Sequence, residues 1–448
     1  MSLRSKFYKH AVYLPVTGLQ AGLVTNQIDT LMKSQSWSPD RIRDLQSHRL
    51  QSLLLATIDS VEAYRDFTAP FADRSANPYD FLTTIPPVSK ADIQKDPNLY
   101  RSTRPLGRTI KKTTGGSTGV PVTILKTRLA LLHELAATWR GYSWAGLDMG
   151  DPQGRFWGIP RTQKGRLLAT LTDLVCHRRR CSAFNFSDQD LADYDRRLKR
   201  FRPTWLYGYV SMLSIYADYL EQNNSEPPPG LKAVVTTSEL LTPGIRNKLE
   251  RVFRVRVFNE YGCGEIGTIA HECERGSLHL SDENMIVEII NGDRVCSRGE
   301  PGEIVVTELH NLAQPLIRYR MGDHGVISPD SCPCGRGLQV LNSILGRAYD
   351  FIVNSEGRRF HGEYLVYLFE ELQKRSRGVR QFQIEQKTID HFIVRIVSHN
   401  ELTTETREEI IRTIQDEIEN QAHIEIDIVT EIPREQSGKI RIIKGLQP

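Results

Sequence analysis

The sequence predicts an α/β protein with a large N-terminal domain and a small C-terminal α/β domain. Between residues 155 and 260, short apolar runs alternate with amphipathic helical runs, which is typical of a largely parallel sheet. From Glu283 the pattern changes to hairpins, which predicts a β-rich subdomain. Beyond Leu345-Gly346-Arg347 the strand-and-helix pattern resumes, and we expect a hinge at that junction.

These changes of pattern divide the chain into three parts. We expect a helical scaffold at residues 1–100, a core with the β-rich subdomain at residues 101–345, and a small mobile domain at residues 346–448. At 448 residues, with 39% hydrophobic and 25% charged residues, the chain is long enough for two or three domains with cores of their own.

The net charge and the cysteine content limit the classes of protein to which the chain can belong. A net charge of +4 does not call for a nucleic-acid partner, and the run His177 to Arg180 is interpreted as a solvated loop or an anion-binding patch. Seven irregularly spaced cysteines favour reduced thiols or metal ligands in a cytoplasmic protein. The apolar stretch at residues 11–24 is too short to cross a bilayer, although it can lie on a membrane or partner surface. No signal peptide is expected.

The elements are predicted in the following order. Amphipathic helices are expected within residues 27–67, a Ser-capped helix start at Ser89, and a strong helix at residues 127–144. Strands are predicted at residues 155–159, 204–208, 233–237 and 255–260, with helices at 188–201, 211–223 and 243–253. The β-rich strands are predicted at residues 285–290, 302–309 and 316–320. The C-terminal domain is predicted to hold strands at 350–353, 381–386, 391–398 and 423–429, with helices at 362–374 and 403–420.

Polar and aromatic residues follow three of the predicted parallel strands. These segments are Tyr207-Gly208-Tyr209, Thr237-Ser238-Glu239, and Asn259 to Glu265. Ligands of open α/β sheets bind beyond the carboxyl ends of the strands, so we expect these side chains to border a binding site.

The segment Thr113 to Pro121 is rich in glycine and hydroxyl residues. Such a loop exposes backbone N–H and O–H donors that can surround phosphate oxygens. It is not a Walker loop, because no lysine follows Gly119, and it does not fit the dinucleotide pattern. Lys111 and Lys112 directly precede the segment and add positive charge that would attract a phosphate group. Taken alone, a loop of this composition is more often an ordinary flexible turn.

In order, Thr-x-Gly-Ser-Thr-Gly-x-Pro resembles the phosphate loop of the adenylate-forming superfamily, and in particular that of phenylacetate-CoA ligase and CapK-type proteins. The resemblance implies a loop that grips the β- and γ-phosphates of ATP. Its residues here are Thr114, Gly115, Gly116, Ser117, Thr118 and Gly119.

Asn259 to Glu265 resembles the Tyr-Gly-x-Ser/Thr-Glu segment of that family. The resemblance implies that Asn259, Glu260, Tyr261 and Gly262 line the ATP site, with Tyr261 against the adenine, and that Glu265 helps to hold Mg²⁺. Gly264 departs from the pattern, because the family usually has a hydroxyl residue there. A plain strand-to-loop turn is the alternative interpretation.

Two further segments match the family in part. Tyr319 to Asp323 resembles Tyr-Arg-Thr-Gly-Asp, in which the Asp323 carboxylate would accept hydrogen bonds from both ribose hydroxyls. Gly346 to Asp350 resembles Gly-Arg-x-Asp-Asp, which places Arg347 against the ribose-phosphate and makes Asp350 or its neighbour the hinge, although Tyr349 is off-pattern. For Tyr319 to Asp323, a type I or II turn with a capping Asp is the alternative interpretation.

Pro433 to Lys439 resembles Pro-x-x-x-Ser-Gly-Lys, which makes Lys439 the candidate catalytic lysine. A mobile ammonium can stabilise the transition state in which a carboxylate meets the α-phosphate. An ordinary surface lysine is the alternative. The five partial matches keep the family's order, which favours the resemblance.

A possible metal cluster lies outside these motifs. Cys273, His279, Cys332 and Cys334 would form a closed Cys3His site for structural Zn²⁺ if the two segments meet. Some family relatives carry Cys/His ligands in this region. Cys263 and His271 are reserve ligands, and simple buried thiols are the alternative.

The resemblance implies an AMP-forming acid–thiol ligase that uses ATP, Mg²⁺ and coenzyme A. The acid is first activated as an acyl-adenylate, and its acyl group then passes to the thiol. Tyr207 and Tyr209 are expected in the acid pocket, with Ser238 and Glu239 at the ATP site, while Glu239 can also be a buried, paired carboxylate. Two alternatives stay open: a ligase acting on a sugar amine or hydroxyl in cell-envelope polysaccharide synthesis, and a nucleotide-binding assembly protein with weak activity. A nucleic-acid module is a remote third.

Overall fold

The computed structural model contains two compact units. It describes residues 3–21, 24–57, 59–68, 77–104, 107–114, 122–158, 163–182, 187–347, 351–357, 359–361, 365, 369, 372, 379–398, 401–433 and 440–446. Unit 1 comprises Met1–Met321 and Val326–Ser343, and unit 2 comprises Gly322–Gly325 and Ile344–Pro448.

Unit 1 begins with helices that pack on the sheet-containing part. They are α1 (Leu3–Phe7), the π-helix η1 (Tyr8–Tyr13), α2 (Leu14–Ala21), α3 (Val24–Ser34), α4 (Pro39–Thr57), η2 (Glu62–Tyr64), α5 (Arg65–Thr68), α6 (Pro78–Leu82) and α7 (Lys90–Lys95). Tyr13 and Val24 are buried, and the indole N–H of Trp139 donates to the Tyr13 hydroxyl at 2.7 Å. Much of the apolar N-terminal stretch thus contacts the protein itself. Among the described helices, none is long and apolar enough to cross a bilayer.

One twelve-stranded sheet organises unit 1. Its order is β11-β10-β12-β13-β14-β9-β8-β7-β6-β5-β3-β4. Its parallel half contains β3 (Gln153–Trp157), β4 (Arg178–Ser182), β5 (Trp205–Tyr209), β6 (Ala233–Thr237) and β7 (Arg256–Cys263). The predicted α/β fold class and parallel sheet are confirmed. The run after His177 is not a solvated loop, because it forms β4 beside β3.

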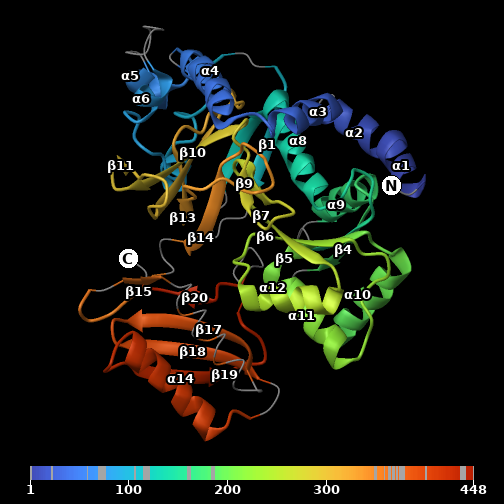
Figure 1. Ribbon diagram of the computed structural model, residues 1–448, viewed down its shortest axis with the longest axis vertical. Coiled ribbons are helices and arrows are strands. Elements are labelled where there is room, and N and C mark those ends of the chain that lie inside the picture. Colours follow the sequence, from blue (N-terminus) through green and yellow to red (C-terminus); the bar gives the residue numbers. More distant parts are fainter. Residues whose placement is uncertain are drawn as a thin grey trace. The chain divides into compact units, whose positions relative to one another are not determined.

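Helices cover both faces of the parallel strands, as Figure 1 shows. On one face, Phe156, Leu206 and Val234 pack beneath α10 (Asp188–Phe201), α11 (Val210–Gln222) and α12 (Pro243–Phe253). On the other face, Trp205 and Val235 pack against α8 (Arg128–Trp144) and the N-terminal helices. Cover on both faces explains why the two central strands, β5 and β6, are buried at every position.

Side-chain caps fix the starts of the helices that the sequence predicted well. The Ser187 hydroxyl accepts from the backbone of Asp190 in a capping box at the start of α10. Thr242 caps α12 ahead of Pro243, and Thr127 caps α8. The helix α9 (Gln163–Val175), in contrast, was not predicted.

The remaining strands of the large sheet form its antiparallel half. They are β8 (Gly267–Glu272), β9 (Leu278–Leu280), β10 (Met285–Asn291), β11 (Arg294–Val295), β12 (Gly302–Glu308), β13 (Tyr319–Ile327) and β14 (Val340–Arg347). The strand predicted at residues 316–320 is placed too early. Arg318 has a left-handed φ of 50° and forms a buried ion pair with Glu288, so the regular strand begins only at Tyr319. A separate hairpin pairs β1 (Thr109–Thr114) with β2 (Val122–Thr127).

Unit 2 is an α/β unit with its own core. Its elements are β15 (Phe351–Val353), β16 (Arg359–His361), β17 (Val379–Thr388), β18 (His391–Ser398), α14 (Thr404–Glu417), β19 (His423–Ile428) and β20 (Ile443–Lys444). The sheet order is β19-β18-β17-β20, and Ile384, Phe392 and Ile414 lie in the core. The helix predicted at residues 362–374 falls largely outside the described residues.

Candidate functional site

The carboxyl ends of β5, β6 and β7 lie side by side. Tyr209 is in register with Thr237, and Thr237 is in register with Glu260. The three segments that the sequence places after these strands therefore meet at one edge of the parallel sheet. This edge is the candidate site of unit 1.

Glu260 lies at the centre of a buried polar network at this edge. Its carboxylate accepts hydrogen bonds from the Tyr207 hydroxyl at 3.0 Å and from the Thr237 hydroxyl at 3.4 Å. Burial raises the pKa of Glu260, while hydrogen bonds from Tyr142 and Tyr207 and the nearby Arg155 oppose that rise. Glu260 thus fastens two neighbouring strands from inside the protein.

Aromatic rings surround this network. Tyr207 is buried, and its hydroxyl donates to Glu260. Burial raises the pKa of Tyr207. The Trp157 ring lies 5.6 Å from that of Tyr207 and 4.5 Å from that of Tyr209. The Arg155 guanidinium lies over both Trp157 and Tyr207. Of the two tyrosines expected in an acid pocket, Tyr207 is directed into the polar network.

Glu239 fixes the loop after β6 to the start of α11. Its carboxylate accepts from the Ser211 backbone N–H at 2.7 Å and from the Ser211 hydroxyl at 3.0 Å. A carboxylate at a helix N-terminus is favoured by the helix dipole. The preceding Ser238 has a left-handed φ of 69°, a strained conformation for a non-glycine residue that is often found at functional sites.

The β7–β8 turn carries Tyr261 and Glu265. Tyr261 is buried, and the strand register shifts between it and Gly262. A Cβ on Gly262 would stand 2.3 Å from the carbonyl oxygen of Gly267, so only glycine fits there. This tight turn places Glu265, which is largely buried, at 3.8 Å from the ammonium of Lys90.

Lys90 reaches this site from the first turn of α7. The helix is fixed by a capping box between Ser89 and Asp92. The residue before it, Val88, bonds through its backbone to Arg318 at 2.9 Å and to Arg320 at 2.8 Å. These contacts hold the N-terminus of α7 against the start of β13. Sequence analysis predicted the helix start but not the position of the lysine.

The hairpin that bears the glycine-rich loop is joined to the same turn. Lys126 on β2 is buried, and its ammonium donates to the carbonyl oxygen of Ile266 at 2.9 Å and to Glu308 at 2.7 Å. Its distance to Glu134 is 3.5 Å, and Glu134 also pairs with Lys112. The base of the hairpin and the Glu265 turn thus form one connected structure.

Several predicted site residues cannot be placed in this geometry. The loop residues Gly115 to Gly119, the hinge candidate Asp350 and the lysine Lys439 lie outside the described residues. The backbones of Thr114 and Arg347 are described, at the ends of β1 and β14. Asp323 lies within β13, in the short segment assigned to unit 2.

Asn259, the first residue of the predicted nucleotide segment, is tied into the sheet. Its backbone N–H donates to Glu272 at 2.9 Å, and its side-chain oxygen lies 3.3 Å from the Thr236 hydroxyl. Asn259 therefore also connects β7 with its neighbours β6 and β8.

The predicted metal ligands come together in unit 1. The ligand atoms of Cys273, His279, Cys332 and Cys334 all lie within 4.8 Å of one another. The Cys273 and Cys332 sulfurs are 3.8 Å apart, and the Cys334 sulfur is 3.2 Å from His279 Nε2. Three thiols and an imidazole match the ligand set of a structural zinc site.

The histidine of this cluster is oriented as a ligand. Its Nδ1 lies 3.2 Å from the Leu338 carbonyl oxygen, which leaves Nε2 directed at the thiols. Burial lowers the pKa of His279 to about 4, so the imidazole is neutral at pH 7. The cluster packs under Trp37, Ile42 and Trp144. The reserve candidates Cys263 and His271 are not members of it.

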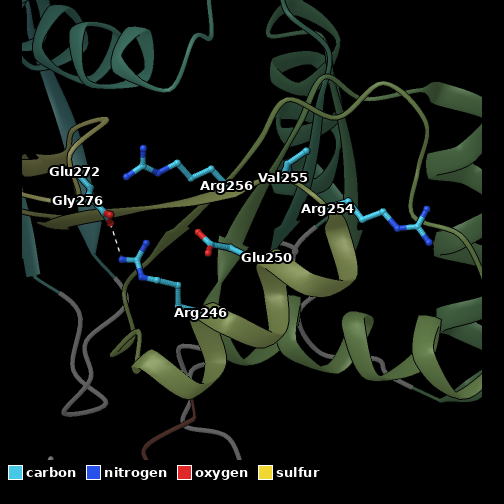
Figure 2. Close-up of a pocket in the computed structure, with 7 residues that line it drawn as sticks. All are labelled: Arg246, Glu250, Arg254, Val255, Arg256, Glu272 and Gly276. Atoms are coloured by element: carbon cyan, nitrogen blue, oxygen red, sulfur yellow. Dashed lines mark hydrogen bonds and ion pairs between the residues drawn. The ribbon is translucent and has the colours of Figure 1, made fainter.

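An open polar pocket of about 600 Å³ lies elsewhere, at the amino end of β7 (Figure 2). Arg246 donates to Glu272 at 2.7 Å, and Arg254 pairs with Glu226. Figure 2 shows the Arg254 side chain pointing away from Arg246 and Glu250. Because ligands of parallel sheets bind at the carboxyl ends, this pocket is not the expected substrate site.

Comparisons with known proteins agree with the resemblance drawn from the motifs. Residues 352–445 match the family model of the CapK C-terminal domain. The chain is similar to protein CapK of Staphylococcus aureus, with 24% identity over 375 residues, 80% of this chain and 79% of CapK. It is also similar to phenylacetate-coenzyme A ligase of Escherichia coli strain K12, with 23% identity over 440 residues, 90% of this chain and 95% of that protein.

Solved structures share the fold. A 2-hydroxyisobutyryl-CoA ligase in complex with R3-HIB-AMP has a TM-score of 0.73 at 16% identity, covering 93% of this chain and 91% of that one. An anthranilate CoA ligase in complex with anthranoyl-AMP has a TM-score of 0.52 at 15% identity, covering 74% and 65% of the two chains. The likeness establishes the architecture shared with these proteins.

Proposed function

Because this chain is related to CapK and the phenylacetate-CoA ligases and has the fold of adenylate-forming CoA ligases, we propose that it is an AMP-forming ligase joining a carboxylic acid to a thiol. The supporting observation is the Lys126 connection. It ties the hairpin of the glycine-rich loop to the turn that carries Tyr261 and Glu265. A phosphate-binding loop and a nucleotide-binding turn need such a link to act on one ATP.

The nucleotide is proposed to be held by residues from several elements. Thr114 to Gly119 bind the β- and γ-phosphates, and Tyr261 contacts the adenine. Asp323 accepts from the ribose hydroxyls, and Arg347 lies against the ribose-phosphate. The relation to phenylacetate-CoA ligases over most of the chain supports these roles.

Glu265 is the proposed magnesium ligand. A carboxylate oxygen is a hard donor that suits this cation. Its distance of 3.8 Å from the Lys90 ammonium is longer than a hydrogen bond, so the pair can separate to admit a cation. Magnesium would neutralise phosphate charge. Lys90 adds a second positive group beside the same phosphates.

In the first step, the substrate carboxylate attacks the α-phosphorus, the bond to the β-phosphate oxygen breaks, and pyrophosphate leaves. Lys439 is proposed to stabilise the two anions as they meet. In the second step, the thiolate of coenzyme A attacks the acyl carbonyl and AMP leaves. The small unit must move between the steps because Lys439 serves only the first, with Asp350 as the proposed hinge.

The acid is proposed to bind beside the aromatic residues at the ends of β3 and β5. Tyr209 and Trp157 offer flat apolar surface there. The relation to CapK favours a role in cell-envelope polysaccharide synthesis, in which a sugar amine or hydroxyl would be the acceptor. A cytoplasmic location suits the use of ATP and coenzyme A.

Pyrophosphate release across a panel of aryl, short-chain and hydroxy acids tests this function. We expect release with at least one acid, an acyl-hydroxamate when hydroxylamine is present, and a thioester when coenzyme A is added. A hydroxamate without any thioester would favour an amine or hydroxyl acceptor. Tight ATP binding without release for any acid would favour an assembly protein and contradict the ligase.

The cluster of Cys273, His279, Cys332 and Cys334 is proposed to bind structural zinc. The orientation of His279 and the packing under Trp144 support this role. Because the cluster joins the β8–β9 turn to the segment after β13, a bound metal would clamp two hairpins of the antiparallel half. It is not proposed to take part in the reaction.

A further inference from the structure

Helix α9 turns an apolar face to solvent. Leu167, Leu168, Leu171 and Leu174, the leucine face, are 62%, 56%, 50% and 62% exposed. Their spacing places them on one side of the helix. Scattered exposed leucines are normal in proteins, but four on a single thirteen-residue helix form a contiguous patch.

The opposite side of α9 holds the helix to the protein. Asp173 is buried there, and it forms a two-pronged ion pair with Arg180 of β4, at 2.8 Å for each contact. Ala169 and Gly165, one and two turns earlier, are half-buried small residues on that side. The helix is thus anchored through its small and polar side, and this anchoring orients the leucine face outward.

The first helix of the chain extends the apolar surface. Leu3 is 87% exposed and Phe7, one turn later, is 63% exposed. The following η1 contacts α9, and Tyr8 stacks on His177 with ring centroids 3.7 Å apart. Helix α1 also contacts η1, and Figure 1 shows α1 and α9 toward the same end of unit 1. The apolar side chains of both helices therefore belong to one region.

The charges of these two segments have one sign. Residues 3–21 contain no acidic residue, and Arg4, Lys6 and His10 are exposed. Helix α9 carries exposed Lys164, and its single acid is the buried, paired Asp173. An apolar face flanked by basic residues is the pattern of helices that lie in the interface of an anionic bilayer.

We propose that the leucine face and α1 dock this protein onto the surface of an anionic lipid bilayer. The charges decide the occupant. A two-fold interface formed by this surface would place basic residues of one copy against basic residues of the other, and neither residues 3–21 nor α9 offers an exposed acid to pair with them. Anionic headgroups instead attract these residues while the leucines enter the acyl boundary. The docking does not depend on which reaction the site catalyses.

Co-sedimentation of the full chain with vesicles tests the docking. We expect binding to vesicles of equal phosphatidylglycerol and phosphatidylcholine at least tenfold tighter than to phosphatidylcholine alone, with a marked loss at 0.5 M salt, because the Debye length then falls to a few ångströms. Equal binding to both vesicles, or to neither, would overturn the proposal.

Leu171→Glu should weaken vesicle binding about tenfold or more, since it removes a leucine that would enter the bilayer and adds a charge of the same sign as the headgroups. Its matched control is Ile389→Glu, which places the same charge at a residue 46% exposed in the β17–β18 turn and should bind as the parent does. Lys6→Gln with Lys164→Gln should weaken binding about twenty-five-fold, at roughly fivefold for each lysine.

Thermal unfolding and light scattering complete the test. Because Leu171 is half exposed, Leu171→Glu should melt within a few degrees of the parent, and the neutral Leu171→Ser serves if it does not. Unchanged vesicle binding by both variants would overturn the proposal. A dimer that Leu171→Glu converts to a monomer would also overturn it, because a second copy would then occupy the face.

Discussion

Lys90 is a residue of the proposed nucleotide site that the sequence did not identify. Its ammonium lies 3.8 Å from Glu265, although the two residues are far apart in the sequence. The sequence offered a Ser-capped helix start at Ser89, which is confirmed, but a lysine at the first turn of a helix carries no sign of its distant partner. The backbone bonds of Val88 to Arg318 and Arg320, together with the capping box at Ser89, determine where Lys90 lies.

Replacing Lys90 with alanine should reduce acyl-adenylate formation about ten- to hundredfold, because a positive group near the developing phosphate charge is lost. Lys95→Ala, at the exposed end of the same helix, is the control and should keep full activity. Pyrophosphate release with a saturating acid measures both. Equal rates for the two variants would show that Lys90 only supports the fold.

A stacked histidine pair makes folding sensitive to pH. The rings of His133 and His310 lie 3.4 Å apart and are nearly parallel. Burial, together with the nearby Arg49, lowers the pKa of His133 to about 4, and burial next to His133 lowers the pKa of His310 to about 2. Both imidazoles are neutral in the folded protein at pH 5 to 7.

The free energy of unfolding should therefore fall as the pH drops below about 6.5. The unfolded chain binds protons on these histidines near pH 6.5, whereas the folded chain does so only near pH 4 or below, so protonation favours unfolding in that window. For His133 the loss between pH 7 and pH 5 is about 2 kcal/mol. Urea unfolding at pH 7 and pH 5 measures it.

His133→Phe, which can keep a ring stacked on His310, should shrink this pH dependence. The exposed His48 on α4 is the control, and His48→Asn should leave the difference between the two pH values as large as in the parent. A parent protein that is equally stable at pH 5 and pH 7 would contradict the prediction.

At the scale of elements, helix caps and hydrophobic periodicity predicted the bounds of helices and strands well wherever these sequence signals were strong. The predicted bounds of α10, β6 and α12 are confirmed residue for residue, because Ser187 and Thr242 cap the helices and β6 is buried throughout. The elements between β3 and α10 were missed for physical reasons. The leucines of α9 face outward, and β4 begins with three arginines, of which Arg180 is held by an ion pair with Asp173 that the sequence does not reveal.

The cluster of Cys273, His279, Cys332 and Cys334, in the segments that follow β8 and β13, is predicted to bind zinc. Protein purified without chelator should contain about one zinc per chain, and Cys334→Ser should lose the metal and melt at a lower temperature, because metal binding to a closed site contributes folding free energy. Cys296→Ser, outside the cluster, is the control. Elemental analysis that finds no metal in the parent would refute the site.

At the scale of the whole molecule, the order of weak motifs was more informative than any one of them. Segments as far apart as Thr114 and Glu265 each fit an ordinary turn, but the family relation they suggested is confirmed by the likeness to CapK and phenylacetate-CoA ligases. The sequence also predicted that strand ends would meet. It could not show that Glu260 and Tyr207 turn inward, because burial at a strand end depends on distant packing.

The two-unit organisation leads to a prediction about Lys439. If this lysine serves only the first half-reaction, Lys439→Ala should reduce adenylation at least a hundredfold and leave thioester formation from a supplied acyl-adenylate nearly unchanged. Lys444→Ala, on β20 of the same unit, is the control. Single-turnover assays of each step measure the split, and equal losses in both steps would contradict the assignment.

Lys126 has one further consequence. A single buried ammonium joins β2, the carbonyl oxygen of Ile266 and the carboxylate of Glu308, so no substitution there can alter one partner alone. Removing the ammonium would leave the buried carboxylate of Glu308 and the partly buried carboxylate of Glu134 without this positive partner. The free energy of unfolding would then fall by about 3–5 kcal/mol. A substitution at Lys126 that alters the nucleotide site would therefore also lower the thermal stability, so directed evolution cannot change one of these properties at this position without the other.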